Sequence, residues 1–336
     1  MSEMKNAVGA GTGRSGDDLC AGNSVREFKI WADVLNYGKK ILKNAGIVEA
    51  DLDSWYLFEE VFGISRAQYF LCARENIVGS TAQKIAVQEQ HGDLLESGNA
   101  LECAELWLKE KLSVYESALK KRAARIPLQQ IIGRQEFMGL TFFVNEHVLI
   151  PRQDTEILVE EVLKELHDGM RVLDMCTGSG CILLSLLHYS NACEGLGVDL
   201  SADALEVAEQ NAETLLDAVN ADRVHFLQSD LFDKVEGKFE IIVSNPPYIA
   251  SAEVEKLMPE VRDHEPRMAL DGTEDGLHFY RRIIEEAGKH LVSSGMLFFE
   301  IGYDQGQAVS ELMRTEGYRE VQVVQDYAGL DRVVFG

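Results

Sequence analysis

The four residues Asn245, Pro246, Pro247 and Tyr248 follow directly after the apolar run FEIIVS. Two of the six prolines among the 336 residues stand here. Proline fixes its own φ and keeps the preceding residue out of the helical region, so Asn245 and Pro246 are held extended. The side-chain oxygen of Asn245 and the carbonyl oxygen of Pro246 become fixed acceptors, and Tyr248 supplies an aromatic face. This pattern predicts a site that holds a planar –NH2 group.

The nitrogen of an amide or an exocyclic amine is a poor nucleophile, because its lone pair is delocalised. Two acceptors that draw its hydrogens toward a pyramidal arrangement free that lone pair, and orientation against an electrophile supplies much of the rate. We therefore expect catalysis by positioning, without a general base. The alternative interpretation of the four residues is a Pro-Pro turn that ends a strand.

A glycine loop, Thr177 to Gly180, follows the apolar run RVLDMC and opens a helical segment. Open α/β sheets bind nucleotides at such a loop. Leu183 occupies the position of the third glycine of a dinucleotide fingerprint, and no Gly-Lys-Ser/Thr follows to hold a triphosphate. Recognition of phosphate is therefore not the best fit.

Three carboxylates, Asp174, Asp199 and Asp230, stand at the ends of three successive strand-like runs. An acid at the position of Asp199 accepts hydrogen bonds from both hydroxyls of a ribose. Asp230 is placed to accept from an adenine amino group, with Leu231 packed on the ring. Together they predict a site for adenosine without phosphates. The alternative is that such acids only cap the following helices, as Ser201 does for ADALEVAEQ in that interpretation.

The elements that must position these residues alternate between short apolar strands and helical segments. Such alternation predicts a parallel sheet with helices on both faces, and the last two runs form an antiparallel edge through a turn at 328–329. The expected strands are 171–176, 195–200, 224–230, 239–245, 296–302, 321–327 and 331–336, and the expected helices are 181–190, 202–219 and 277–292.

A chain of this length favours two domains. We expect a disordered lead over residues 1–24, a helical domain over 25–130, a β-hairpin linker over 131–150 and an α/β domain over 151–336. Within the helical domain, apolar residues recur at three and four positions in 28–42, 51–63, 65–76 and 104–126. The polar stretch 79–100 fits either a loop or a poorly packed helix.

The composition of the chain argues against several classes of function. The net charge of -24 repels phosphate backbones, which argues against a protein that binds nucleic acid. No apolar run approaches the ~20 residues that span a bilayer, and the first residues lack a signal-peptide pattern. The six cysteines form no CxxC pair and the eight histidines show no ligand spacing, so we expect reduced thiols, no metal and a cytoplasmic location.

The segments DMCTGSG, GVDLS and NPPY together resemble class I S-adenosylmethionine-dependent methyltransferases that act on planar nitrogens. The flanking stretches RQEFMGLTFFVNEHVLIPRQDTEILVEEVL and EPRMALDGTEDGLHFYRRI resemble the HemK/PrmC family of release factor glutamine methyltransferases. The resemblance covers about residues 120–336. It implies a Rossmann-like, seven-stranded methyltransferase domain with a small all-helical N-terminal domain, which recognises the substrate, and a β-hairpin linker.

The resemblance also implies the reaction. The cofactor is S-adenosylmethionine, released as S-adenosylhomocysteine, and the acceptor is the glutamine side-chain amide in the Gly-Gly-Gln motif of peptide chain release factors, which act in translation termination. The residues so implied to bind the glutamine amide are Asn245, Pro246, Pro247 and Tyr248. The residues implied at the cofactor are Phe137, Asp174, Cys176, Thr177, Gly178, Ser179, Gly180, Asp199, Leu200, Asp230, Leu231 and Asn245.

Two positions depart from the family pattern. Cys176 stands where many members have glycine, so we expect the backbone there to avoid positive φ. Leu231 replaces an aromatic residue of some members, which weakens stacking on adenine. Two other functions stay open: methylation of an exocyclic amine of adenine or guanine in nucleic acid, and a catalytically silent adaptor that uses the cofactor fold to bind a partner.

Overall fold

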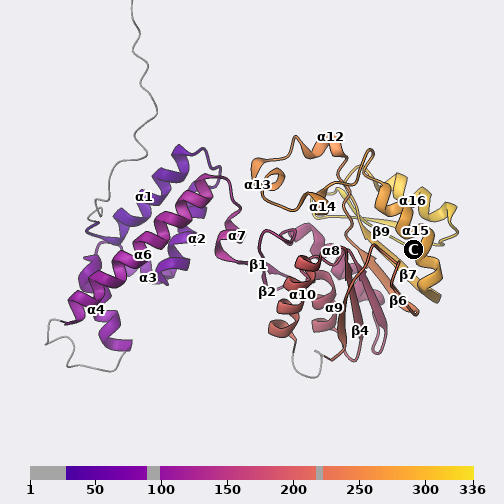
Figure 1. The fold of residues 1–336 in the computed structure, drawn as a ribbon, viewed down its shortest axis with the longest axis horizontal. Coiled ribbons are helices and arrows are strands. Elements are labelled where there is room, and N and C mark those ends of the chain that lie inside the picture. Colours follow the sequence, from indigo (N-terminus) through magenta and orange to yellow (C-terminus); the bar gives the residue numbers. More distant parts are fainter. Residues whose placement is uncertain (1–27, 89–98, 217–221) are drawn as a thin grey trace, which may run out of the picture. The chain divides into compact units, whose positions relative to one another are not determined.

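The computed structural model of the chain describes residues 28–88, 99–216 and 222–336 (Figure 1). By its internal contacts the chain divides into two units, residues 1–37 with 64–113 and residues 38–63 with 114–336. The lead expected over residues 1–24 lies outside the described residues, and the other expected domain boundaries stay a prediction.

Helices form the N-terminal part of the chain, as the spacing of its apolar residues predicts. They are α1 (Trp31–Asn44), α2 (Ala50–Phe62), α3 (Arg66–Cys72), α4 (Ile77–Gln88), α6 (Asn99–Ala123) and α7 (Leu128–Ile132). Ser65 and Gln68 form a capping box at the start of α3, and Gly63 ends α2 in the left-handed conformation. The first part of the stretch 79–100 belongs to α4 and is therefore helical.

Each unit holds its helices with buried polar contacts as well as apolar packing. In the first unit, the indole N–H of Trp31 donates to Ser80 Oγ at 3.0 Å. In the second, the fully buried Tyr115 places its hydroxyl 3.1 Å from Ser54 Oγ. Gly38 is required beside it, because a Cβ at this position would lie 2.0 Å from the Tyr115 oxygen.

The expected hairpin is confirmed. Strands β1 (Arg134–Phe137) and β2 (Leu140–Phe143) pair antiparallel through a turn at Met138 and Gly139, both at positive φ. The N–H of Met138 donates to Glu156 Oε1 at 2.6 Å, and the Met138 carbonyl accepts from the Tyr189 hydroxyl at 2.6 Å. The turn is thus fixed to the two helices that follow it.

A seven-stranded sheet forms the centre of the second unit, as expected from the alternating pattern. Its strands are β3 (Arg171–Met175), β4 (Glu194–Asp199), β5 (Val224–Gln228), β6 (Phe239–Ser244), β7 (Leu291–Glu300), β8 (Gln322–Gln325) and β9 (Asp331–Phe335). Their order is β5-β4-β3-β6-β7-β9-β8. Neighbouring strands are parallel except at β9, which is antiparallel to both β7 and β8, so the expected antiparallel edge is confirmed.

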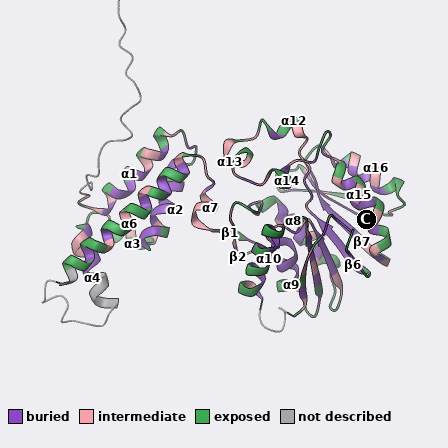
Figure 2. Ribbon diagram, viewed as in Figure 1, coloured by how far each residue is buried: buried purple, intermediate pink, exposed green. Residues whose placement is uncertain are grey.

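The central strands β3 and β6 are buried on both faces, which explains why they are mainly apolar (Figure 2). Val172 and Ile241 pack into one core, with helices α8 (Gln153–Glu165), α9 (Cys181–Tyr189) and α10 (Ala202–Leu215). Leu173 and Ile242, the next residues in each strand, pack into the other core with α15 (His278–His290) and α16 (Gly306–Thr315). Side chains that alternate along a strand thus serve two cores.

Three one-turn helices, α12 (Ser251–Val254), α13 (Pro259–Arg262) and α14 (Arg267–Leu270), follow Tyr248. Within the second unit, Glu260 Oε1 on α13 accepts from Arg122 and Arg125 at 3.1–3.2 Å. The segment returns to the sheet edge, where the N–H of Ile249 donates to Leu270 O at 3.0 Å.

Among the described residues, no helix combines the length and the apolar character needed to cross a membrane.

Candidate active site

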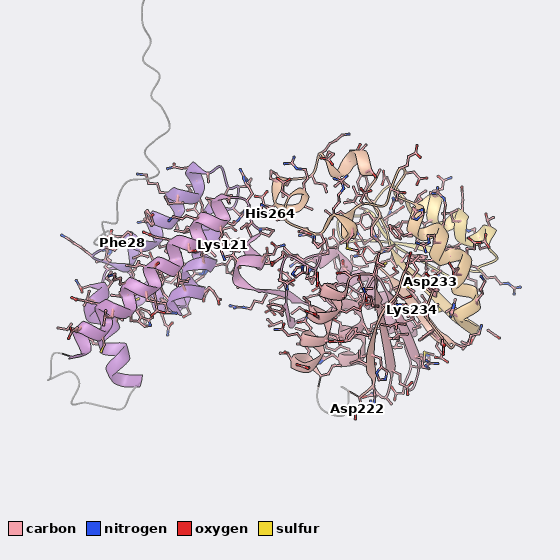
Figure 3. All side chains as sticks on the ribbon, in the orientation of Figure 1. Phe28, Lys121, Asp222, Asp233, Lys234 and His264 are labelled. Atoms are coloured by element: carbon pink, nitrogen blue, oxygen red, sulfur yellow. The ribbon has the colours of Figure 1, made fainter. Side chains whose placement is uncertain are left out.

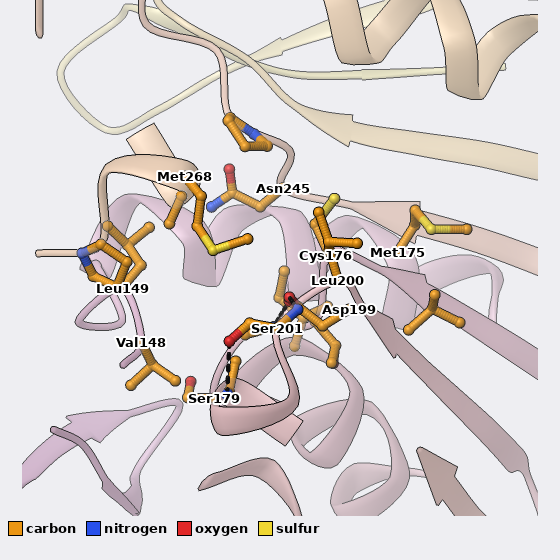
Figure 4. Close-up of a pocket in the computed structure, with 18 of the residues that line it drawn as sticks. Val148, Leu149, Met175, Cys176, Ser179, Asp199, Leu200, Ser201, Asn245 and Met268 are labelled. Atoms are coloured by element: carbon orange, nitrogen blue, oxygen red, sulfur yellow. Dashed lines mark hydrogen bonds between the residues drawn. The ribbon is translucent and has the colours of Figure 1, made fainter. Parts of the chain in front are cut away.

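A cavity of about 210 Å³ lies at the carboxyl ends of the central parallel strands (Figure 4). The loops after β3, β4, β5 and β6 all contribute to its wall, as expected for a parallel sheet. The residues named from the sequence that line it are Cys176, Thr177, Gly178, Ser179, Asp199, Leu200, Asp230, Leu231, Asn245 and Pro247.

Five other residues named from the sequence are not part of the cavity wall. Phe137 and Asp174 are fully buried, Phe137 in the core beneath the hairpin and Asp174 behind the glycine loop. Gly180 starts α9, while Pro246 and Tyr248 lie in the loop after β6. Their roles in binding or catalysis stay predictions, as do those of the residues on the wall.

The glycine loop is held by bonds to β4. The N–H of Thr177 donates to Val198 O at 3.0 Å, and the N–H of Gly178 donates to Asp199 Oδ2 at 2.9 Å. The expectation for Cys176 is wrong, because its φ is +62°. A left-handed residue other than glycine costs roughly 1–2 kcal/mol, and it persists here because these bonds fix the turn directly after it.

Asp199 already holds two backbone groups. Its Oδ1 accepts from the N–H of Ser201 at 2.9 Å, and its Oδ2 accepts from Gly178. Burial raises the pKa of Asp199, and these backbone bonds oppose the rise. Since each carboxylate oxygen has a second lone pair, the group is free to accept hydroxyl hydrogens from the cavity as well. Ser201 does cap α10, accepting from the N–H of Ala204 at 3.2 Å.

Asp174 lies one layer behind the glycine loop. Its Oδ2 accepts from the Thr177 hydroxyl at 2.6 Å, while its Oδ1 is buried without a partner among the described residues. Burial raises the pKa of Asp174 to about 7, against the opposing effect of the Thr177 bond. Its visible role is to hold Thr177, because it does not itself face the cavity.

The loop after β5 brings a charged and an apolar residue to the wall. Asp230 is exposed and pairs with Arg282 at 2.9 Å, whereas Leu231 is buried at a φ of +48°. Lys234, labelled in Figure 3, closes the loop, since its Nζ donates to Gln228 O at 3.0 Å. Because Asp230 already pairs with Arg282, an adenine amino group that binds there would compete with Arg282 for the carboxylate.

The loop after β6 is held by side chains on three sides. The hydroxyl of Ser244 donates to Met175 O at 2.6 Å, which ties the end of β6 to β3. The side-chain amide of Gln305 donates to Tyr248 O at 3.0 Å. The Tyr248 hydroxyl donates to Glu300 Oε1 at 3.3 Å, and burial is the main reason that the pKa of this tyrosine is raised.

Two glycines approach the same loop more closely than any side chain allows. A Cβ at Gly272 would lie 2.8 Å from Pro247 O, and one at Gly276 would lie 2.3 Å from Tyr248 O. Only glycine fits at such distances. The sequence shows these glycines in the stretch ALDGTEDGL, but nothing in it shows what they contact.

Asn211 on α10 is a positioning residue that sequence reasoning missed. It is 1% exposed, and its Nδ2 donates to Ser179 O at 2.9 Å and to Phe143 O at 3.1 Å. Its Oδ1 accepts from the N–H of Phe143 at 2.7 Å. The side chain therefore joins the glycine loop to the hairpin. A polar residue on the buried face of an amphipathic helix was the available signal.

The described residues hold no group of three or more His, Cys, Asp or Glu side chains that could bind a metal ion. The described wall of the cavity offers hydrogen-bond acceptors, backbone N–H groups and apolar side chains.

The chain is similar in sequence to known methyltransferases. The methyltransferase small domain matches residues 152–261, and the PrmC N-terminal domain matches residues 33–88. A release factor glutamine methyltransferase of Caulobacter vibrioides is 38% identical over 305 residues, covering 89% of this chain and 93% of the relative. One of Moorella thermoacetica is 48% identical over 219 residues, covering 64% of this chain and 76% of the relative.

A solved structure of a protein-(glutamine-N5) methyltransferase (release factor-specific) from Alicyclobacillus acidocaldarius is 33% identical to the chain. The match covers 58% of this chain and 97% of that chain at a TM-score of 0.34.

The raised pKa of Asp174 predicts a pH dependence of stability. In the unfolded chain this carboxyl ionises near its ordinary pKa of about 3.9, whereas in the folded chain it keeps its proton up to about pH 7. The wild type therefore loses stability from this group as pH rises from about 4 to 7, by a few kcal/mol. Asp174→Asn should remove that loss. Denaturant unfolding of both proteins across this range tests it, and parallel stability curves would show that Asp174 does not titrate as described.

The contacts of Asn211 predict looser backbone in the glycine loop when they are removed. Asn211→Leu keeps the branched shape of the side chain but loses the donor to Ser179, a change worth about 1–3 kcal/mol for a buried group. Hydrogen exchange in the peptide that contains residues 176–180 should quicken at least about tenfold. Gln210→Leu, on the exposed side of the same helix, is the control. Equal exchange rates in the two variants would show that Asn211 does not fix the glycine loop.

Proposed function

Because the chain belongs to the release factor glutamine methyltransferase family, we propose that it methylates the side-chain amide nitrogen, N5, of a glutamine in peptide chain release factors, using S-adenosylmethionine. The glutamine is the one in the Gly-Gly-Gln motif. The observation that carries the proposal is the loop of residues 245–248, which is held in place at both ends and from which Asn245 and Pro247 line the cavity at the carboxyl ends of the strands.

The sheet confirms the seven-stranded methyltransferase domain expected from the sequence, and the matched methyltransferase small domain lies within it. Its cavity fits the cofactor by the chemistry of its wall. Asp199 offers carboxylate oxygens suited to ribose hydroxyls, and Leu231 offers an apolar surface suited to adenine. The glycine loop offers small residues beside which a methionine chain fits. When bound, S-adenosylmethionine supplies an electrophilic methyl group on a sulfonium.

The protein's own contribution is to orient the acceptor amide. Asn245 Oδ1 and the Pro246 carbonyl oxygen accept the two amide hydrogens, and Tyr248 lies against the amide plane. Drawing both hydrogens out of that plane returns electron density to nitrogen, and the fixed backbone spares the cost of reorganisation. No side-chain base is needed, which agrees with a loop that offers acceptors and an aromatic ring.

The rival acceptor, an exocyclic amine of a nucleic-acid base, would meet the same two oxygens. The net charge of -24 favours a protein acceptor, because an acidic surface repels a phosphate backbone. We therefore include in the proposal a release factor as partner, no direct contact with nucleic acid, and a cytoplasmic site of action. The relatives named above are release factor enzymes, which favours activity over a silent adaptor.

The direct test incubates the protein with S-adenosylmethionine and an unmethylated release factor, followed by mass spectrometry of the peptide with the Gly-Gly-Gln motif. The proposal requires one added methyl group on that glutamine. Transfer to an RNA or DNA control, with none to the factor, would instead support the rival acceptor.

The acceptor role of Asn245 predicts a defect in turnover. Asn245→Ala removes one of two oriented acceptors and should lower kcat by about 10²–10³. Affinity for S-adenosylhomocysteine, measured by calorimetry, should change little. Asn191→Ala, in an exposed loop, serves as the matched control. A turnover that stays within about tenfold of the wild type, only ~1.4 kcal/mol, would exclude the acceptor role.

A further inference from the structure

Glu300 is a buried carboxylate that the proposed reaction does not use. It is the last residue of β7, it is 2% exposed, and its neighbours Phe299 and Ile301 belong to the apolar core. Burial raises its pKa, which records the cost of keeping a charge in this place. Such a side chain breaks the pattern of an apolar strand, and departures of this kind concentrate at functional sites.

The contacts of Glu300 run to both sides of the site. Its Oε1 accepts from the Tyr248 hydroxyl at 3.3 Å. The side chain of Thr155, which is 2% exposed and lines the cavity, lies near enough to lower the pKa of Glu300. The carboxylate is thus within reach of both the loop after β6 and α8.

A structural ion pair does not explain this carboxylate. Arg332 lies near enough to lower the pKa of Glu300, but its ion pairs within 4.0 Å in the described part of the chain go to Asp154, at 3.3 Å, and Asp326, at 3.0 Å. The second oxygen of Glu300, Oε2, is buried without a partner among the described residues. Among the described residues, the Tyr248 hydroxyl is therefore the side-chain group at hydrogen-bond distance from this carboxylate.

We propose that Glu300 is a positioning residue for the transfer step. It holds the Tyr248 hydroxyl, and through it the ring, in the orientation that places the aromatic face against the acceptor amide. It holds Thr155 in the cavity wall at the same time. The inference rests on the proposed function, since it requires an amide held between Asn245 and Tyr248.

The geometry explains why one bond matters. The backbone of Tyr248 is fixed by Gln305 and by the close approach of Gly276, but these contacts leave the side-chain torsions free. A hydrogen bond at the far end of the ring restricts both torsions at once. Misplacement of a positioning group by about 1 Å costs up to about 10²-fold in rate.

A double-mutant cycle between Glu300 and Tyr248 tests the inference. The measurement is kcat on the whole release factor at saturating cofactor for Glu300→Ala, Tyr248→Phe and the double variant. If Glu300 acts through the tyrosine, Glu300→Ala should lower kcat about tenfold in the wild-type background and cause no further loss beside Tyr248→Phe. The KM for the release factor should stay within about threefold, because the defect lies in orientation rather than in binding.

Glu300→Gln supplies the rescue, since its amide oxygen still accepts from the Tyr248 hydroxyl and kcat should stay within about threefold of the wild type. Glu240→Ala is the matched control and should not change kcat, because this carboxylate lies near the amino end of β6, at the opposite end of the strands from the cavity. Should Glu300→Ala fail to fold by circular dichroism, Glu300→Met keeps the volume and takes its place in the cycle.

Two results would overturn the inference: losses from Glu300→Ala and Tyr248→Phe that multiply in the double variant, or a Glu300→Gln variant as slow as Glu300→Ala. A wild-type protein that transfers no methyl group to the factor would instead overturn the proposed function. The two failures are thus distinguishable.

Discussion

The backbone of residues 245–248 is held between the end of β6 and the loop that contains Gly272 and Gly276, and the rest of the site depends on this close approach. Two prolines restrict the torsions of the segment, but restricted torsions alone do not fix its place. A Cβ at either glycine would lie within 3 Å of the backbone of this segment. The segment therefore has no room to shift toward the loop of the two glycines. The bond from Gln305, the N-cap residue of α16, to Tyr248 O holds the same segment. Acceptors fixed before the substrate arrives need no reorganisation during the reaction.

The topology of the sheet explains why the loop of residues 245–248 and the glycine loop line the same cavity. From β3 the chain proceeds outward to β4 and β5, and then returns to place β6 on the other side of β3. Loops on either side of this reversal diverge, and ligands bind in the crevice that opens between them. The glycine loop follows β3 and Asn245 follows β6, so the reversal brings the proposed adenosine site and the proposed amide site together. Asn211, from α10, fixes the glycine loop to the hairpin.

Much of the fold and of the candidate site could be predicted from the sequence. The remaining features could not, because they depend on tertiary contacts. The strands, the loop of residues 245–248 and the placement of Asp199 follow from local pattern, because buried parallel strands are apolar runs and their ends carry the site. Glu300 could not be recognised, since a carboxylate in an apolar run has meaning only through what the fold places beside it. The positive φ of Cys176 was missed because residue type predicts torsions only where tertiary hydrogen bonds do not decide them.

Gly276→Ala tests most directly whether close backbone contact holds the acceptors. The variant adds a Cβ that would lie 2.3 Å from Tyr248 O at a φ of +72°, whereas Gly169→Ala adds one at a φ of +81° with nothing within 4 Å. The second variant therefore carries the same backbone strain without the contact. We expect kcat to fall by at least about 10² in Gly276→Ala only, with the affinity for S-adenosylhomocysteine kept in both variants. Equal turnover in the two variants would contradict it.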